Sequence, residues 1–157
     1  MPVPVMMWLT SPDYLVGDIV MEIFGEGGDD IIWGANNSQS LSGGTGNDSL
    51  FGGSGDDILI GGRGADIFEF VLDLTNGNDT VTDYNAIEGD VVKLYVDDSS
   101  KQLSASDFEN NTLHFEGGSV LFHNSSILTF DELEIAYNFI WLNKIQSDEC
   151  RNFTPLD

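Results

Sequence analysis

"GGTGNDSLFGGSGDDILIGGRGAD", residues 43–66, repeats a pair of glycines followed by an aspartate every nine residues. Aligned on these glycines, five nonapeptides follow one another without an insertion: GEGGDDIIW (25–33), GANNSQSLS (34–42), GGTGNDSLF (43–51), GGSGDDILI (52–60) and GGRGADIFE (61–69). The eighth position of every copy is apolar: Ile32, Leu41, Leu50, Leu59 and Phe68. A fixed period of this kind predicts a solenoid.

Each nonapeptide divides into a turn and a short strand. The first six residues are rich in Gly, Asp and Asn, which favour tight turns, and the apolar eighth residue points inward from the strand. Two nonapeptides then make one coil of 18 residues, so alternate repeats stack on the same edge. One edge carries Asp30, Asp48 and Asp66, and the other carries Gln39 and Asp57.

Stacked carboxylates repel one another unless a cation lies between them. Oxygen ligands with several charged carboxylates suit Ca²⁺ better than Mg²⁺, which requires octahedral geometry and retains its waters. Soft metals are disfavoured because the repeats contain neither thiolates nor clustered histidines. The repeats therefore predict calcium sites between stacked turns.

The overall charge limits the possible partners. The 157 residues include five Lys and Arg against 27 Asp and Glu, for a formal net charge of −22. Nucleic acid and anionic membrane surfaces are excluded as partners because both require a basic surface. The hydrophobic content of 41% is nevertheless that of a folded chain rather than of a disordered acidic tail.

Processing signals are sparse. Cys150 is the only cysteine, which excludes an internal disulfide. The first ten residues contain no Lys or Arg, unlike the start of a secretory signal, and no stretch reaches transmembrane length. We expect either a cytosolic protein or one that is exported without an N-terminal signal.

Residues 25–69 resemble the RTX (hemolysin-type) calcium-binding repeat GGxGxDxUx. Residues 64–94 are similar to the segment that closes the RTX roll in serralysin-type metalloproteases and in the R-modules of mannuronan epimerases. The resemblance implies an all-β fold, a right-handed parallel β-roll with calcium between stacked turns. It also implies secretion by a type I system, which such repeats usually accompany.

The resemblance implies two complete calcium sites. The first takes the carbonyl oxygens of Glu26, Gly28, Gly43 and Thr45 with the carboxylates of Asp30 and Asp48. The second takes the carbonyl oxygens of Gly44, Gly46, Gly61 and Arg63 with Asp48 and Asp66. A further site would join Gly53 O, Gly55 O and Asp57 to Asp83 and Asp90. The site at Gln39 is expected to be weak or empty, because its side chain offers only a neutral amide oxygen.

The single file of apolar residues in the roll buries little area, so caps and calcium are expected to stabilise it. We divide the chain into an N-terminal cap (1–24), the roll (25–69), a closing and C-terminal capping region (70–143) and a flexible tail (144–157). The capping region is predicted to contain a strand at 90–96, a hairpin at 111–123 around Gly117-Gly118, and an amphipathic helix at 129–142. The inner face of the hairpin would carry Leu113, Phe115, Val120 and Phe122.

The outer face of one sheet is unusually apolar, since Ile31, Trp33, Phe51 and Ile67 point outward from the strands. Either the C-terminal part of the chain packs over this face, or the face binds a polysaccharide or a partner protein.

No catalytic motif is present. The chain has no HExxH or GxSxG sequence, and His114 and His123 are more simply exposed strand residues than a metal pair. The sequence therefore predicts a non-enzymatic calcium-binding module that folds after secretion. Two alternatives remain open: a calcium-dependent polysaccharide-binding module, and the C-terminal fragment of a larger secreted enzyme.

Overall fold

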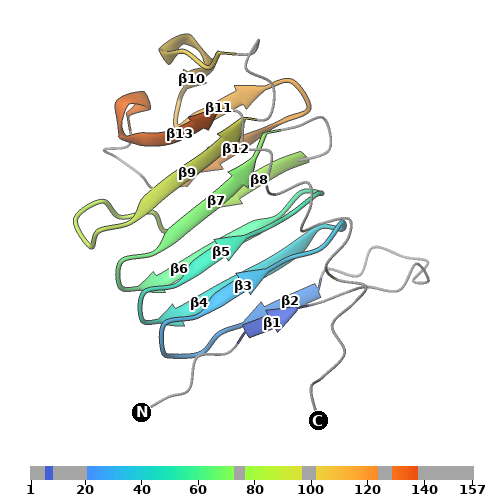
Figure 1. Cartoon of the computed structure of the whole chain (residues 1–157), viewed down its shortest axis with the longest axis vertical. Coiled ribbons are helices and arrows are strands. Elements are labelled where there is room, and N and C mark those ends of the chain that lie inside the picture. The colour runs from blue at the N-terminus through green and yellow to red at the C-terminus, as the bar shows by residue number, and fades with distance from the viewer. Residues whose placement is uncertain (1–5, 9–20, 73–76, 97–101, 124–128, 138–157) are drawn as a thin grey trace.

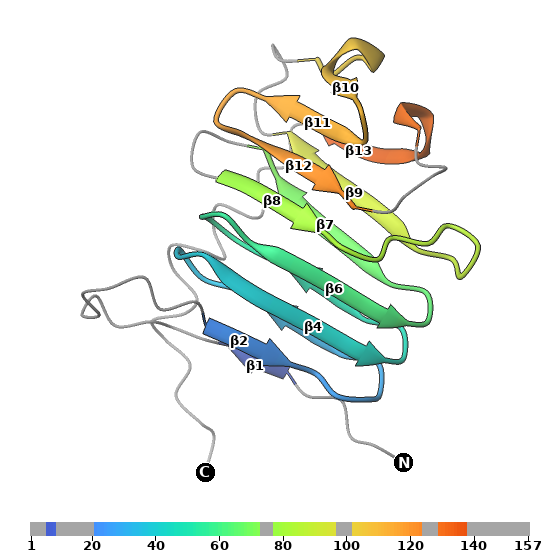
Figure 2. The same ribbon diagram turned by 180° about the vertical axis from the view of Figure 1, so that it is seen from behind.

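The repeats build two sheets that face each other across a narrow core (Figure 1; Figure 2 shows the reverse side). This computed structural model describes residues 6–8, 21–72, 77–96, 102–123 and 129–137. The first sheet has the strand order β1 (Met6–Trp8), β3 (Ile31–Trp33), β5 (Ser49–Phe51), β7 (Ile67–Val71), β9 (Val91–Val96) and β13 (Leu133–Tyr137). The second has the order β10 (Phe108–Glu109), β11 (Thr112–Phe115), β12 (Gly118–Phe122), β8 (Gly77–Val81), β6 (Ile58–Arg63), β4 (Gln39–Thr45) and β2 (Met21–Phe24).

Consecutive repeats alternate between the two sheets. Leu50 pairs with Ile32 on one side and with Phe68 on the other, and Leu41 of the second sheet pairs with Leu59. Each of these pairs joins residues 18 positions apart, and all the pairings among β1 to β9 are parallel. The predicted all-β parallel β-roll, with one coil for every two nonapeptides, is confirmed.

The eighth residue of every repeat lies in the core, as expected from the periodicity. Ile32, Leu41, Leu50, Leu59 and Phe68 are each at most 1% exposed. The alternating side-chain directions of a strand explain this burial, because the seventh and ninth residues point to the opposite face.

The roll continues beyond the five nonapeptides. Val81 of β8 pairs with Leu59, Val92 of β9 pairs with Phe68, and both valines are fully buried. These pairs lie 22 and 24 residues apart rather than 18, because the chain carries short insertions in its connecting segments. Two degenerate repeats therefore follow the regular ones.

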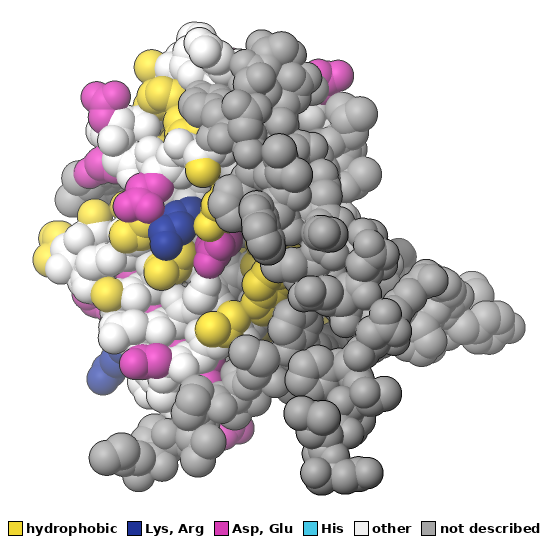
Figure 3. Space-filling view, in the orientation of Figure 1, with side chains coloured by type: hydrophobic (Ala, Val, Ile, Leu, Met, Phe, Trp, Pro, Cys, Tyr) yellow, Lys and Arg dark blue, Asp and Glu magenta, His cyan; other side chains and the backbone are white. Residues whose placement is uncertain are grey.

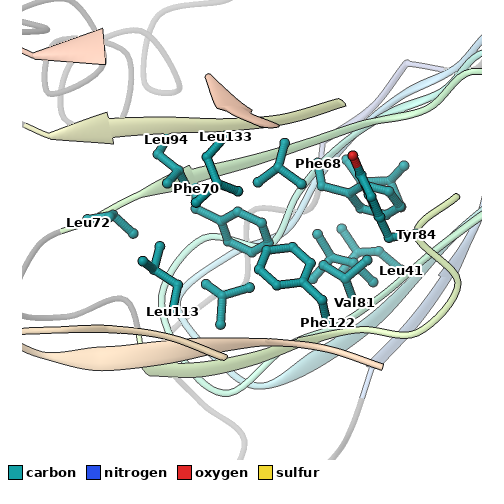
Figure 4. Close-up of a cluster of buried hydrophobic side chains, with 14 of the residues drawn as sticks. Leu41, Phe68, Phe70, Leu72, Val81, Tyr84, Leu94, Leu113, Phe122 and Leu133 are labelled. Atoms are coloured by element: carbon teal, nitrogen blue, oxygen red, sulfur yellow. The ribbon is translucent and has the colours of Figure 1, made fainter. Parts of the chain in front are cut away.

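At the C-terminal end of the roll, Phe70, Leu94, Leu113 and Phe122 lie in the space between the sheets (Figure 4). The predicted strand at 90–96 is confirmed as β9. The predicted hairpin is confirmed as β11 and β12, although Phe115 pairs with Gly118, so the turn is Glu116-Gly117 rather than Gly117-Gly118.

The inner face of the hairpin is also as predicted. Leu113, Val120 and Phe122 are buried, and Phe115 packs against the same core while remaining partly exposed.

The predicted helix at 129–142 is wrong. Residues Phe130–Glu132 form a short 3₁₀ turn (η2), in which the N–H of Thr129 donates a hydrogen bond to the carboxylate of Glu132, and β13 follows at once. Leu133 and Ile135 alternate along β13 and pair with Val92 and Leu94 of β9. Residues 133–137 therefore add to the edge of the first sheet as a strand parallel to β9, although their local sequence pattern is that of a helix. Residues 138–142 lie outside the described residues.

The apolar outer face is partly covered. Phe51 is 6% exposed and its ring lies 5.1 Å from that of Trp33, whereas Ile31 remains 44% exposed. The described C-terminal strands β12 and β13 extend the two sheets. Whether residues 138–157 pack over this face stays a prediction, because they lie outside the described residues.

Candidate metal centres between the stacked turns

The sixth residues of alternate repeats stack directly on one another along the first edge. Asp30, Asp48 and Asp66 are each 1% exposed. The backbone N–H of Asp30 donates to Oδ1 of Asp48 at 2.8 Å, and that of Asp48 donates to Oδ1 of Asp66 at 2.9 Å. The column continues to Asp90, whose Oδ1 accepts from the N–H of Asp66 at 2.9 Å.

The second edge has a shorter column. The N–H of Gln39 donates to Oδ1 of Asp57 at 2.8 Å, and that of Asp57 donates to Oδ1 of Asp79 at 3.0 Å. Asp79 is 2% exposed and was not among the residues expected from the sequence. The expected pairing of Asp57 with Asp83 and Asp90 is replaced by its pairing with Asp79, and Asp90 belongs to the first edge.

Asp83 has a different position from the one expected. Its two carboxylate oxygens accept hydrogen bonds from the N–H groups of Gly61 (2.9 Å) and Gly62 (2.8 Å). At the corresponding position of earlier repeats, the N–H of Gly25 donates to the carbonyl of Ser42. Asp83 thus replaces a backbone acceptor where the insertion before Asp90 takes the chain out of register.

The second oxygen of these aspartates carries the strongest indication of a ligand. Oδ2 of Asp48 and Oδ2 of Asp57 are buried and have no hydrogen-bond partner among the described residues. Leaving a buried charged oxygen without a partner is costly, and proteins avoid it with a hydrogen bond, an ion pair or a metal ion. A cation bound beside these oxygens would supply the partner that they lack.

Backbone oxygens converge on the same places. A Cβ added to Gly25 would lie 2.6 Å from the carbonyl oxygen of Gly43 and 2.7 Å from Oδ2 of Asp30. The carbonyl oxygen of Gly43 and Oδ2 of Asp30, which are two of the six ligands predicted for the first site, therefore both lie close to the same point beside Gly25. A Cβ at Gly43 would likewise overlap Oδ2 of Asp48, so the first position of the repeat must be glycine. The carboxylate lies against the backbone of its own turn.

The surroundings of several of these carboxylates favour the neutral form over the charged one. Burial raises the pKa of Asp57 from 3.8 to about 7. Burial also raises the pKa of Asp66 to about 6, and the neighbouring charges of Asp90, Asp48 and Asp83 add to that increase. Burial raises the pKa of Asp48 and Asp90 as well. A bound divalent cation would reverse these shifts by favouring the ionised carboxylates.

Side chains alone do not form a metal site. Among the described residues, no three His, Cys, Asp or Glu side chains are grouped so that they could hold a metal ion. A cation in the roll would therefore need turn carbonyls in addition to each pair of aspartates, as hard oxygen ligands suit calcium. His114 and His123 are both exposed, and Cys150 lies outside the described residues.

A sequence signal for Asp79 exists in retrospect. Gly77–Val81, "GNDTV", closely matches Gly46–Leu50, "GNDSL". The four residues inserted before it displace it from the nine-residue frame, which is why a search in fixed register does not find it.

Acidic side chains are scattered over the described surface. In the described part of the face shown in Figure 3, acidic side chains outnumber basic ones. No helix within the described ranges is long and apolar enough to cross a membrane.

Comparison with protein families agrees with this geometry. Residues 22–38 and 33–68 match the family model described as the RTX calcium-binding nonapeptide repeat (4 copies). The match spans nearly all of the regular repeats and supports the RTX repeat family for this segment. RTX nonapeptide repeats bind calcium, and no enzyme family matches. No curated protein and no solved structure matches the chain.

Proposed function

We propose that this chain is a non-catalytic calcium-binding module whose fold depends on calcium bound between stacked turns. The observation that carries the proposal is the pair of buried carboxylate oxygens, Oδ2 of Asp48 and Oδ2 of Asp57, that have no hydrogen-bond partner in the described part of the chain. The match of residues 22–68 to RTX calcium-binding repeats supports calcium as the cation.

Four pairs of stacked aspartates are candidates for holding an ion: Asp30 with Asp48, Asp48 with Asp66, Asp66 with Asp90, and Asp57 with Asp79. The first two pairs would be completed by the carbonyl oxygens expected from the repeat. Thr45 O and Arg63 O already accept hydrogen bonds from Gly28 and Gly46 at 2.8 and 2.9 Å, and each carbonyl retains a second lone pair for an ion.

The pair Asp57 and Asp79 supports a site on the second edge. The backbone at Gly77 passes close to the turn of the fourth repeat, because a Cβ added there would overlap the carbonyl oxygen of Gly55. Gly55 O is one of the ligands expected for Asp57, and Asp79 now supplies the second carboxylate.

Linkage explains how calcium would control folding. An ion that binds only the native state stabilises it by RT ln(1 + [Ca²⁺]/Kd). Extracellular calcium modules bind with Kd values of about 10⁻⁴–10⁻³ M, so their sites are empty at cytosolic calcium concentrations. The chain would remain unfolded until secretion by a type I system and would fold in the higher calcium outside.

Equilibrium dialysis of the purified chain tests the proposal. We expect between two and four calcium ions per chain in about 10 mM calcium, and no displacement by an equal concentration of magnesium. The matched control is Asp131→Asn, which changes an exposed acidic residue far along the chain from the repeats and should leave the ion count unchanged. A chain that binds no calcium under these conditions would exclude the proposed function.

A further inference from the structure

The second nonapeptide, residues 34–42, differs from its neighbours in backbone conformation as well as in sequence. In the other four repeats, the second and fourth residues of the turn all have positive φ: Glu26, Gly28, Gly44, Gly46, Gly53, Gly55, Gly62 and Gly64. The equivalent residues Ala35 and Asn37 do not. The carbonyl of Ala35 nevertheless keeps the usual direction, because it accepts a hydrogen bond from the N–H of Ser54 as that of Glu26 accepts one from Thr45. The difference lies at Asn37: a Cβ added to Gly55 would be nearer to the carbonyl carbon of Asn37 than to its oxygen, whereas at Gly46 the nearest atom is the carbonyl oxygen of Gly28.

Glu26 shows that this difference is not a simple consequence of lacking glycine. It has a side chain, yet its φ of +68° places it in the left-handed region with the glycines of the other turns. Such a conformation is unfavourable for a residue with a Cβ. The first repeat therefore accepts strain to keep the turn conformation that the second repeat abandons.

The side chain of Gln39 occupies the place of the missing carboxylate. Gln39 is 2% exposed, and its Oε1 accepts a hydrogen bond from the N–H of Ala35 at 2.8 Å. A Cβ added to Gly34 would overlap both this Oε1 and the carbonyl oxygen of Gly52. At the corresponding point beside Gly25, the two flanking atoms are Oδ2 of Asp30 and the carbonyl oxygen of Gly43.

The two kinds of turn thus differ in what satisfies the buried oxygen. Within the described ranges, Oδ2 of Asp48 and Oδ2 of Asp57 lack a hydrogen-bond partner, whereas Oε1 of Gln39 has one within its own turn. The extra methylene of glutamine lets the amide oxygen reach back to the N–H of Ala35. A neutral oxygen that is already hydrogen-bonded does not need a cation.

We infer that the turn of residues 34–39 closes without an ion, with the Gln39 amide in place of the metal, and that Ala35, Asn37 and Gln39 together decide that this turn binds none. The inference rests on the proposed function. The two edges would then differ in the number of ions that they bind. The first edge has an uninterrupted column of aspartates, whereas the second would bind a cation between Asp57 and Asp79 but not between Gln39 and Asp57.

A single substitution should therefore not create a calcium site. In Gln39→Asp the carboxylate is present, but Asn37 still turns its carbonyl away from the direction found in the other repeats. The triple variant Ala35→Gly, Asn37→Gly and Gln39→Asp has the sequence GGNGSDSLS and restores the repeat pattern in full. We expect the triple variant to bind one more calcium ion per chain than wild type, and Gln39→Asp to bind no more than wild type.

Equilibrium dialysis in saturating calcium measures all three proteins, with Gln39→Ala as a fourth. Gln39→Ala should bind as many ions as wild type while unfolding at a lower temperature, because it loses only the hydrogen bond to Ala35. Loss of one ion in Gln39→Ala would overturn the inference by showing that Gln39 is a ligand. A gain of one ion in Gln39→Asp alone, or no gain in a folded triple variant, would also overturn it. These results are distinct from failure of the proposed function, in which wild type itself binds no calcium.

Discussion

Removal of calcium by excess chelator at neutral pH is expected to abolish most of the β-sheet circular dichroism of this chain. The inner file of the repeats has one apolar side chain for each nonapeptide, which is a small core for so many ordered residues. Without ions, the stacked pairs of buried aspartates also repel one another. Far-ultraviolet circular dichroism during a calcium titration should show cooperative recovery that magnesium does not reproduce. Identical spectra in chelator and in calcium would contradict calcium-dependent folding.

Acid should partly replace calcium in the same experiment. The pKa of Asp57 in the folded chain is about 7 and that of Asp66 about 6, both above the ordinary value of 3.8, because burial disfavours the ionised form. Between the ordinary pKa of 3.8 and these raised pKa values, the folded state therefore binds more protons than the unfolded state. The stability of the folded state accordingly rises as pH falls from about 7 to about 4. We expect the chelated chain to regain part of its circular dichroism at about pH 5.

The matched variant Asp57→Asn should show a weaker response to pH, because it removes the carboxyl group with the larger of the two shifts. A chelated chain that is as unfolded at acidic pH as at neutral pH would contradict the role assigned to carboxylate repulsion.

The substitution Asp48→Asn is expected to weaken two calcium sites at once. Asp48 stacks between Asp30 and Asp66, so its carboxylate belongs to both pairs. The amide oxygen of Asn can still accept the hydrogen bond from the N–H of Asp30, so the change removes charge while the backbone contact remains. Each saturated site contributes about 2.7 kcal/mol when calcium is at 100 times Kd, and loss of two sites should lower the free energy of unfolding by about 5 kcal/mol.

Three further variants control this experiment. Asp30→Asn should cost about half as much, since Asp30 shares one described pair, whereas Asp66→Asn should match Asp48→Asn because Asp66 also stacks against Asp90. Asp29→Asn removes an exposed carboxylate from the same turn as Asp30 and should leave calcium binding unchanged. Equal, negligible losses in all four variants, measured by thermal unfolding in calcium, would exclude shared aspartates as ligands.

The regular repeats could be predicted from the sequence because their information is local and periodic. The inward position of Leu41, Leu50 and Leu59 follows from a nine-residue frame that no insertion disturbs. The stacking of Asp30, Asp48 and Asp66 follows from the same frame once two repeats make one coil.

The remainder depends on pairings that the local sequence does not specify. Asp79 extends the second column of aspartates because β8 pairs in register with β6, and Asp90 extends the first column because β9 pairs in register with β7. Insertions of unequal length precede the two strands, so the nine-residue frame does not reveal these pairings. Leu133 and Ile135 fit the apolar face of a helix as well as that of a strand, and the exposed edge of β9 decides between them. The turn of residues 34–39 likewise contains a hydrogen bond, from the N–H of Ala35 to buried Gln39, that the repeat pattern does not specify.

Anomalous diffraction from crystals grown in calcium would locate the ions directly. The account predicts one peak between Asp30 and Asp48 and another between Asp48 and Asp66, each within about 2.3–2.6 Å of carboxylate and carbonyl oxygens, with none beside Gln39. Water or empty space between those aspartates, in crystals saturated with calcium, would contradict it.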